Sequence, residues 1–272
     1  MAVKNPHWTA KKYLGQHFLI SEKVKQAIIA TCPPSTDAIL EIGPGAGALT
    51  DLLPALQKPL LTIEIDQRFI PHLQTLMPAP NIVAANALAV DYATLLKPYK
   101  AVWVVSNMPY NIAAPLMRQL LPHTSLAGMT LMMQKEMANK VLLLPPKQGM
   151  NSLGLLLQSF WEINQVCVVD PAAFRPRPKV NSAVLFFSPR QHPWLPLPQL
   201  LAWEKFLRQL FAHRRKQIQS VLTGMSKTAW PAVDSAAIAA ELLQKALITP
   251  TYRAEALRPS QILRLFQSWQ TL

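Results

Sequence analysis

The chain has 272 residues, half of them apolar, which suffices for one large domain and a smaller one and excludes a disordered protein. It carries 27 Lys and Arg against 14 Asp and Glu, a formal net charge of +13. That excess indicates a polyanionic partner. Nucleic acid fits better than a membrane, because no uninterrupted apolar run approaches the roughly 20 residues that span a bilayer.

The cysteines, the histidines and the composition of the N-terminus indicate the cellular compartment and whether a metal site is expected. Cys32 and Cys167 form no CxxC pair and the histidines are scattered, so we expect thiols in a reducing compartment and no metal site. Residues 1–12 include charges and a tryptophan but no apolar core of the kind that signal peptides have. We therefore expect a cytoplasmic protein, and we also expect it to act as a monomer.

The chain begins with a basic arm, residues 1–20, which a first helix follows. Lys11 and Lys12 place positive charge ahead of Gln16-His17-Phe18-Leu19. Such an arm can fold over a ligand, although terminal segments are more often merely frayed. Ser21 is a suitable N-cap for a helix that runs to Ala30.

A glycine-rich loop follows the first predicted strand, 38–42. Glycines at Gly43 and Gly45 allow a tight turn and close approach to a ligand, with a helix N-terminus behind them. The next strand, 60–65, ends in Glu64, and an acidic group there suits a ribose with two hydroxyls. Gly43, Gly45 and Ala48 also satisfy the dinucleotide pattern G-x-G-x-x-A, so a nicotinamide enzyme stays open at this point.

Strands and helices continue to alternate, which predicts a parallel, doubly wound α/β sheet. Strand 81–85 ends in Asn86, and strand 101–106 ends in Asn107. A helix over 112–121 and a strand over 129–133 follow. Ligands of such sheets bind beyond the carboxyl ends of the strands. Gly43, Glu64, Asn86 and Asn107 all fall at such ends, so we expect one site at this rim.

The segment after the fourth strand, Asn107-Met108-Pro109-Tyr110, suits chemistry on an aromatic amine. Such an amine is a poor nucleophile, because its lone pair is delocalised into the ring, and alkylation requires acceptors that hold its hydrogens. The Asn107 side-chain oxygen and the Met108 carbonyl are candidates, since Pro109 fixes the backbone. Tyr110 can stack on an extruded base, which is worth roughly 1–3 kcal/mol. An ordinary X-Pro turn is the alternative.

The remaining segments complete the first domain and add a second. Helices are expected over 134–144 and 151–161, and strands over 165–169 and 180–187. Between these strands lies a stiff cationic loop with an aromatic tip, which can press on a phosphate backbone or a base or simply connect the strands; it holds Phe174, Arg175, Arg177 and Lys179.

A proline-rich linker separates the two domains. We place the catalytic domain at 1–188, the linker at 189–199 and a helical domain at 200–272. The helical domain holds Arg214-Arg215-Lys216, which we expect to contact RNA from a helix.

Several of these motifs together resemble the rRNA adenine N6,N6-dimethyltransferase family. The resemblance covers about residues 11–258, and it rests on the segments Gln16-His17-Phe18-Leu19, 41–50, Glu64-Ile65-Asp66, 107–112, 133–136, 178–184 and Arg253-Ala254-Glu255. It implies an α/β fold of the class I S-adenosylmethionine-dependent methyltransferases, Rossmann-like, with a mostly parallel seven-stranded sheet and a small C-terminal all-helical domain. It also implies transfer of methyl groups to the N6 amines of two adjacent adenosines near the 3′ end of small-subunit rRNA, within the immature small ribosomal subunit.

The resemblance also implies roles for individual residues. Asn107, with Met108, Pro109 and Tyr110, would hold the target adenine beside the sulfonium methyl of S-adenosyl-L-methionine. The cofactor would be bound by Gln16, His17, Leu19, Gly43, Gly45, Glu64, Ile65, Asn86, Ala87 and Asn107. RNA would be bound by Lys11, Lys12, Phe174, Arg175, Arg177, Lys179, Arg214, Arg215 and Lys216.

At a few positions this chain has a different residue from the one usual in the family, and these differences affect the expected roles. The family usually has an aspartate where this chain has Asn86, so charge assistance is lost at a cost on the order of 1 kcal/mol, and we expect weaker cofactor binding. Lys140 and Met150-Asn151 stand where the family often has Arg and Tyr-Gly, which affects one side of the expected RNA path.

Three other functions stay open. The erythromycin-resistance branch modifies an adenosine of large-subunit rRNA, and Val180-Asn181-Ser182 fits it slightly better, whereas the glycine loop and Arg253-Ala254-Glu255 favour the small-subunit branch. A non-catalytic ribosome-assembly factor on the same fold is a second possibility. A nicotinamide dehydrogenase is a third, although it has no need of the acceptors at Asn107.

Overall fold

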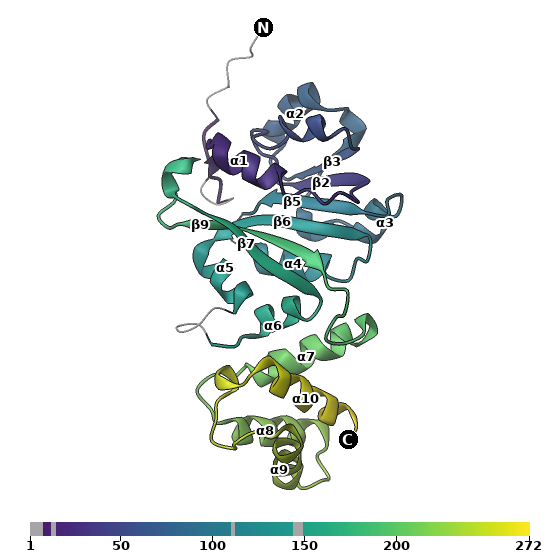
Figure 1. Ribbon diagram of the computed structural model, residues 1–272, viewed down its shortest axis with the longest axis vertical. Coiled ribbons are helices and arrows are strands. Elements are labelled where there is room, and N and C mark those ends of the chain that lie inside the picture. The colour runs from purple at the N-terminus through teal and green to yellow at the C-terminus, as the bar shows by residue number, and fades with distance from the viewer. Residues whose placement is uncertain (1–7, 12–14, 110–111, 144–148) are drawn as a thin grey trace. The chain divides into compact units, whose positions relative to one another are not determined.

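The computed structural model describes residues 8–11, 15–109, 112–143 and 149–272, and the chain divides into two compact units (Figure 1). The first comprises Met1–Ala138 and Trp161–Pro189, and the second Asn139–Phe160 and Arg190–Leu272. Residues 139–160, which the sequence assigned to the catalytic domain, therefore group with the helical unit. The cause is local packing: the Trp203 ring N–H donates to the Ser159 hydroxyl at 2.9 Å, and the Trp194 N–H donates to the Ser159 carbonyl at 2.9 Å.

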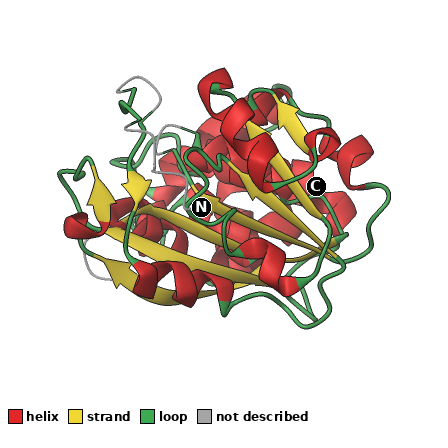
Figure 2. Ribbon diagram, turned by 90° about the horizontal axis from the view of Figure 1, so that it is seen from above, coloured by secondary structure: helices red, strands yellow, loops and turns green. Residues whose placement is uncertain are grey.

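The first unit is built on a twisted sheet, which Figure 2 shows as a layer of adjacent strands. In the described part of the chain the sheet has seven strands in the order β4-β3-β2-β5-β6-β9-β7, parallel except for the antiparallel β9. The strands are β2 (Ala38–Ile42), β3 (Leu60–Glu64), β4 (Ile82–Ala84), β5 (Val102–Asn107), β6 (Leu126–Gln134), β7 (Trp161–Val169) and β9 (Ser182–Pro189). The predicted parallel α/β fold is confirmed, with strand order reversing between β2 and β5.

Helices cover the sheet and account for its apolar strands. The α-helices of this unit are α1 (Glu22–Ile29), α2 (Ile70–Leu76), α3 (Tyr92–Leu96) and α4 (Ala113–Leu120), and α5 (Lys135–Leu142) begins in this unit and ends in the second. All residues of β2 and β3 are buried, as expected for strands covered on both faces. On one face, alternate strand residues such as Trp103 and Val105 pack with Val24 and Ile28 of α1 in a single apolar cluster.

A second, two-stranded sheet fastens the N-terminal arm. β1 (Phe18–Leu19) pairs antiparallel with β8 (Phe174–Arg175), with Phe18 opposite Arg175 and Leu19 opposite Phe174. The Ile20 N–H adds a hydrogen bond to the Ala173 carbonyl at 2.8 Å. Leu19 and Phe174 both enter the apolar cluster beneath. Phe174 is only 2 % exposed, so the prediction that it forms the aromatic tip of an RNA-binding loop is wrong.

The segment after the glycine loop also differs from expectation. Residues 45–52 form turns, and a short 3₁₀ helix (Leu53–Leu56) follows, so no regular helix begins behind the loop. Gly43, Gly45 and Gly47 have φ values of 70°, 55° and 83°, and left-handed residues at alternate positions prevent a regular right-handed helix.

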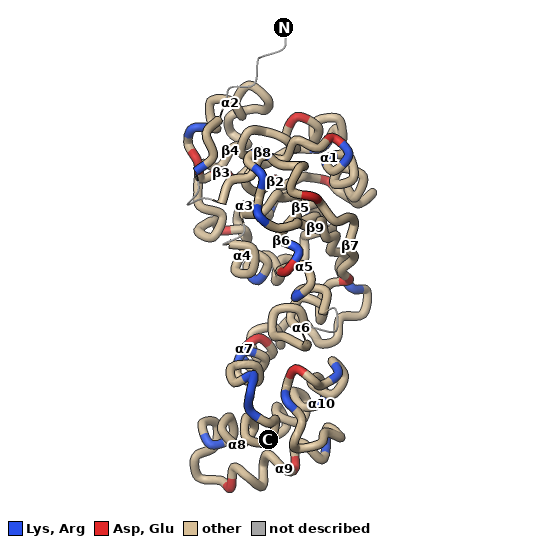
Figure 3. The backbone as a smooth tube through the Cα atoms, turned by 90° about the vertical axis from the view of Figure 1, so that its left-hand side faces the viewer, with Lys and Arg blue, Asp and Glu red and all other residues tan. Residues whose placement is uncertain are grey.

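The second unit is helical. Its α-helices are α6 (Ser152–Gln158), α7 (Leu200–Leu210), α8 (Ile218–Ala229), α9 (Ser235–Ala246) and α10 (Pro259–Gln270). Trp203 and Phe206 of α7 stack 6.0 Å apart, and Phe266 of α10 contacts both rings. The basic run at Arg214 lies in the exposed turn that joins α7 to α8, where a helix was expected (Figure 3, blue between α7 and α8). Along the described residues, no helix has the length and apolar character needed to cross a membrane.

Candidate functional site

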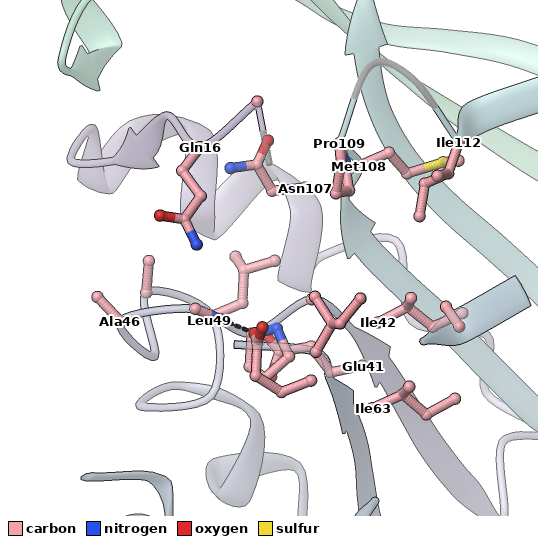
Figure 4. Close-up of a pocket in the computed structure, with 18 of the residues that line it drawn as sticks. Gln16, Glu41, Ile42, Ala46, Leu49, Ile63, Asn107, Met108, Pro109 and Ile112 are labelled. Atoms are coloured by element: carbon pink, nitrogen blue, oxygen red, sulfur yellow. Dashed lines mark hydrogen bonds between the residues drawn. The ribbon is translucent and has the colours of Figure 1, made fainter. Parts of the chain in front are cut away.

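A pocket of about 210 Å³ lies where the carboxyl ends of β2, β3, β4 and β5 meet the arm. Every residue predicted to bind the cofactor lines it, together with Met108 and Pro109. Figure 4 shows Gln16 and Asn107 on one side of this pocket and Ala46 and Leu49 on the other. Tyr110 and Lys12 lie outside the described residues. The lining also includes residues that the sequence did not single out, among them Phe18, Glu41 and Leu49.

The glycine loop forms one wall of the pocket. The Gly43 N–H donates to the Ile63 carbonyl at 2.8 Å, which links the end of β2 to β3. A Cβ on Gly45 would touch the Phe18 ring at 3.8 Å, so the loop lies directly against the arm. With φ of 70° and 55°, Gly43 and Gly45 occupy backbone conformations that L side chains rarely adopt.

Glu64 ends β3 with its carboxylate held by the backbone. One oxygen accepts from the Gly45 N–H at 2.8 Å and the other from the Asp66 N–H at 2.7 Å. Burial raises the pKa of this carboxyl, and the backbone donors oppose that rise. A carboxylate has about four lone-pair sites, so both oxygens keep capacity for a pair of ribose hydroxyls.

Glu41 is the functional candidate that sequence reasoning missed. It is 2 % exposed, lines the pocket and accepts a hydrogen bond from the Thr50 hydroxyl at 2.6 Å. Burial raises the pKa of Glu41 to about 8, and the charge of Glu64 adds to that rise. Its signal was visible in the sequence, because a lone acid within an otherwise apolar strand is costly to bury.

The Asn86 side chain forms a hydrogen bond with the backbone two residues further along the chain. Its side-chain oxygen accepts from the Leu88 N–H at 3.0 Å and begins a short 3₁₀ helix, Ala87–Ala89. The opposite end of the carboxamide is then the NH₂ group, which donates and cannot accept. The side chain therefore offers a ligand in this pocket less acceptor capacity than a carboxylate at the same place.

Asn107 ends β5 with its carboxamide at the pocket. The amide nitrogen donates to the His17 carbonyl at 3.0 Å, which leaves the oxygen as the other end of the group. The Met108 N–H donates to the Met132 carbonyl at 3.0 Å and fixes the following peptide. The structure thus brings together the two acceptor-bearing residues that the sequence predicted, at the rim of one pocket.

The arm is clamped beside this pocket by Asp66. Its carboxylate accepts from Lys11 Nζ at 3.2 Å, from Gln16 Nε2 at 3.0 Å and from Arg68 at 2.6 Å. These hydrogen bonds, Arg68 first, lower the pKa of Asp66, so the clamp stays charged across the neutral range. Trp8 packs against Phe69 with ring centroids 4.9 Å apart.

The charges of the pocket discriminate between cofactors. Glu64 and the mostly protonated Glu41 line it, and its lining contains no Lys or Arg among the residues that the structure describes. A dinucleotide needs donors or cations for its pyrophosphate, usually at a helix N-terminus, and no regular helix begins behind this loop. A cofactor with a sulfonium and an ammonium group suits a pocket that has the Glu64 carboxyl and no Lys or Arg in its described lining.

The sequence matches the family of ribosomal RNA adenine dimethylases over residues 8–268. The chain belongs to this family. It is therefore an rRNA-modifying methyltransferase, and the predicted fold class and enzymatic class are confirmed.

Relatives resemble the dimethylase along nearly its whole length. A protein of Acidithiobacillus ferrooxidans named ribosomal RNA small subunit methyltransferase A is 33 % identical over 264 residues, covering 95 % of this chain and 94 % of its own. One of Bacillus pumilus with the same name is 32 % identical over 272 residues, covering 97 % and 92 %.

Two solved structures share the fold. The 23S rRNA methyltransferase ErmE is 25 % identical with a TM-score of 0.68, covering 93 % of this chain and 99 % of its own. A dimethyladenosine transferase from Plasmodium falciparum is 23 % identical with a TM-score of 0.73, covering 94 % and 98 %.

Surface positions of the dimethylase agree only partly with the predicted RNA contacts. Arg175 of β8 is exposed, as are Arg177 and Lys179 after that strand and Arg214, Arg215 and Lys216 between α7 and α8. Lys11 instead forms an ion pair with Asp66. Within the described ranges, no cluster of three or more His, Cys, Asp or Glu side chains could hold a metal.

Proposed function

We propose that this enzyme transfers methyl groups from S-adenosyl-L-methionine to the N6 amines of two adjacent adenosines near the 3′ end of small-subunit rRNA, in the cytoplasm and as a monomer. The names of the relatives support the small-subunit substrate. The observation that carries the chemistry is the anchored Asn107 carboxamide at the rim of a pocket that Glu64 lines and whose described lining residues include no Lys or Arg.

The pocket residues fit this cofactor, and we assign them separate roles. The cofactor supplies an electrophilic methyl carbon on a sulfonium. Gly43 and Gly45 allow the backbone to approach its methionine part, and Glu64 accepts from its ribose hydroxyls. Glu64, when ionised, gives the pocket a negative charge that favours a cation, whereas Glu41, whose pKa is raised to about 8, is mostly protonated near neutral pH.

Asn107 and Met108 act on the target amine. The Asn107 oxygen and the Met108 carbonyl accept its two hydrogens, which directs the nitrogen lone pair away from both and towards the cofactor site. As the amine gains a bond it becomes more acidic, and its proton leaves to solvent without a dedicated base. The contribution of the protein is positioning, which is worth several kcal/mol in well-oriented reactions.

The basic surfaces supply affinity for RNA. Arg175 and Arg177 extend from the first unit, and the turn at Arg214 extends from the second. Phosphate contacts need only donors and positive charge, so exposed Arg and Lys side chains suffice for this task.

Methyl transfer from tritiated S-adenosylmethionine tests this proposal. Purified protein is incubated with immature small subunits, with large subunits and with no RNA, and primer extension then locates the modified adenosines. We expect label in the small subunit at two neighbouring positions. Label confined to the large subunit would instead assign the 23S activity that ErmE's name describes. Tight RNA binding without label would assign a non-catalytic assembly factor.

A further inference from the structure

The arm lines the pocket with residues 15–19 and is held on two sides. Asp66 binds Gln16 and Lys11 on one side, and pairing of β1 with β8 fixes Phe18 and Leu19 on the other. His17 lies between these attachments. The His17 backbone carbonyl contacts Asn107, and the His17 ring contacts Pro176.

The backbone of His17 determines the orientation of the Asn107 carboxamide. The His17 carbonyl can only accept, and the Asn107 group 3.0 Å away must therefore be the NH₂ end of the amide. A carboxamide without such an anchor rotates between two orientations of similar energy, because its terminal torsion is broad and roughly two-fold. The reversed orientation would present donors to a substrate amine that needs acceptors.

The ring of His17 determines where that carbonyl lies. His17 Nδ1 is 2.8 Å from the Pro176 carbonyl, and because a carbonyl only accepts, Nδ1 carries the hydrogen. Pro176 follows β8, so this contact and the β1–β8 pairing hold the same short segment of the arm. His17 thus connects the exposed cationic loop to the amide at the pocket rim.

We infer that His17 is a positioning residue for methyl transfer: its ring, bound to the Pro176 carbonyl, holds the His17 carbonyl where it fixes the Asn107 carboxamide with the oxygen towards the substrate amine. This inference rests on the proposed role of Asn107. Many residues that line the pocket contribute to cofactor binding. The role inferred for His17 is different, because it concerns the orientation of the Asn107 carboxamide.

A pair of substitutions isolates the ring contact. His17→Phe keeps an aromatic ring but removes the donor, whereas His17→Asn places an amide donor close to where Nδ1 lies. His192→Phe is the matched control, because His192 is exposed and lies in the other unit. Folding of each variant is checked by thermal unfolding.

The orientation is measured directly by NMR of the ¹⁵N-labelled protein. The Asn107 side-chain amide signal is identified by its loss in Asn107→Ala. In His17→Phe we expect its hydrogen exchange to accelerate at least about tenfold, as loss of one net hydrogen bond implies. His17→Asn should restore the protection, and His192→Phe should not change it. An Asn107 signal in His17→Phe identical to that of the wild type would overturn the inference.

Kinetics add a readout that a purely structural role would not produce. We expect His17→Phe to lower kcat about tenfold at saturating cofactor while the cofactor Kd changes less, with kcat recovered in His17→Asn. Equal losses in both His17 variants would refute the assignment. If Asn107→Ala keeps full turnover, the proposed role of the carboxamide fails, whatever His17 does. If Asn107→Ala is inactive and His17→Phe is unimpaired, only the inference about His17 fails.

Discussion

The pocket and the basic turn between α7 and α8 differ in how firmly their polar side chains are held, and we propose that they recognise their ligands by opposite means. In the pocket, Glu64 and Asn107 have hydrogen-bond partners that fix their geometry. In the turn, Arg215 and Lys216 project into solvent. Fixed groups select one arrangement of atoms, whereas exposed charges attract any phosphate backbone with a strength that salt controls. We therefore propose that the enzyme keeps chemistry and affinity on separate residues, so that each can be removed without the other.

The largest effect should come from Asn107. Replacing it with alanine removes one acceptor for the amine, and by analogy with other preorganised groups kcat should fall roughly 10²–10³-fold. RNA affinity should stay within about twofold, because phosphate contacts supply most of it. Single-turnover assays and filter binding measure the two quantities. A parallel loss of RNA affinity would break the proposed separation.

Glu41 should make the stability of the pocket depend on pH. Its pKa rises from 4.5 to about 8 in the folded protein. Below the lower value both states are protonated and the full stability is present. As pH rises towards about 8, the unfolded chain releases a proton that the folded one retains, so stability falls. Between these two pKa values the free energy of unfolding should fall by a few kcal/mol, because each unit of pKa difference corresponds to about 1.4 kcal/mol. Glu41→Gln should remove this fall. Urea unfolding of both proteins at pH 5 and pH 8.5 measures it, and parallel curves would contradict the assignment.

Lys216 tests the proposed role of the basic turn in RNA affinity. Lys216→Ala should weaken binding of small-subunit RNA up to about tenfold and lower the slope of log K against log salt by about 1, with kcat unchanged at saturating RNA. Lys227→Ala serves as the control, since Lys227 is also exposed, in α8. Equal effects from both lysines would indicate general attraction to the whole unit.

The smallest effect concerns Asn86. Asn86→Asp supplies a second acceptor oxygen while the first still caps the Leu88 N–H, so cofactor affinity should rise about fivefold, or on the order of 1 kcal/mol. Calorimetric titration of S-adenosylhomocysteine into both proteins measures it. Unchanged affinity would show that the amide already serves the cofactor as well as a carboxylate does.

The sequence predicted those parts of the fold that depend on local pattern. Strand 38–42 was predicted with its observed bounds, and the other strands of the sheet were located to within a few residues, because buried parallel strands are short apolar runs between polar ends. The residues at those ends converge on the pocket for the same reason.

What the sequence did not predict depends on contacts between distant segments. The pairing of Phe18 with Arg175 joins positions far apart in the chain, and a two-residue strand has no pattern of its own. The burial of Phe174 follows from that pairing and reverses its expected role. The hydrogen bond from Asn107 to the His17 carbonyl could not be predicted either, because every residue has a backbone carbonyl and the sequence does not indicate which one accepts a side-chain hydrogen bond.

The shortness of the β1–β8 ladder has a consequence for successive reactions. A dimethylated adenosine consumes two cofactor molecules, so a spent one must leave and a fresh one enter between the first and second methyl groups. Residues 15–19 line the pocket, and the ladder that holds Phe18 and Leu19 contains two residue pairs. We expect so short a ladder to separate and re-form without unfolding of the first unit. We expect its opening rate to set the interval between the two methyl additions.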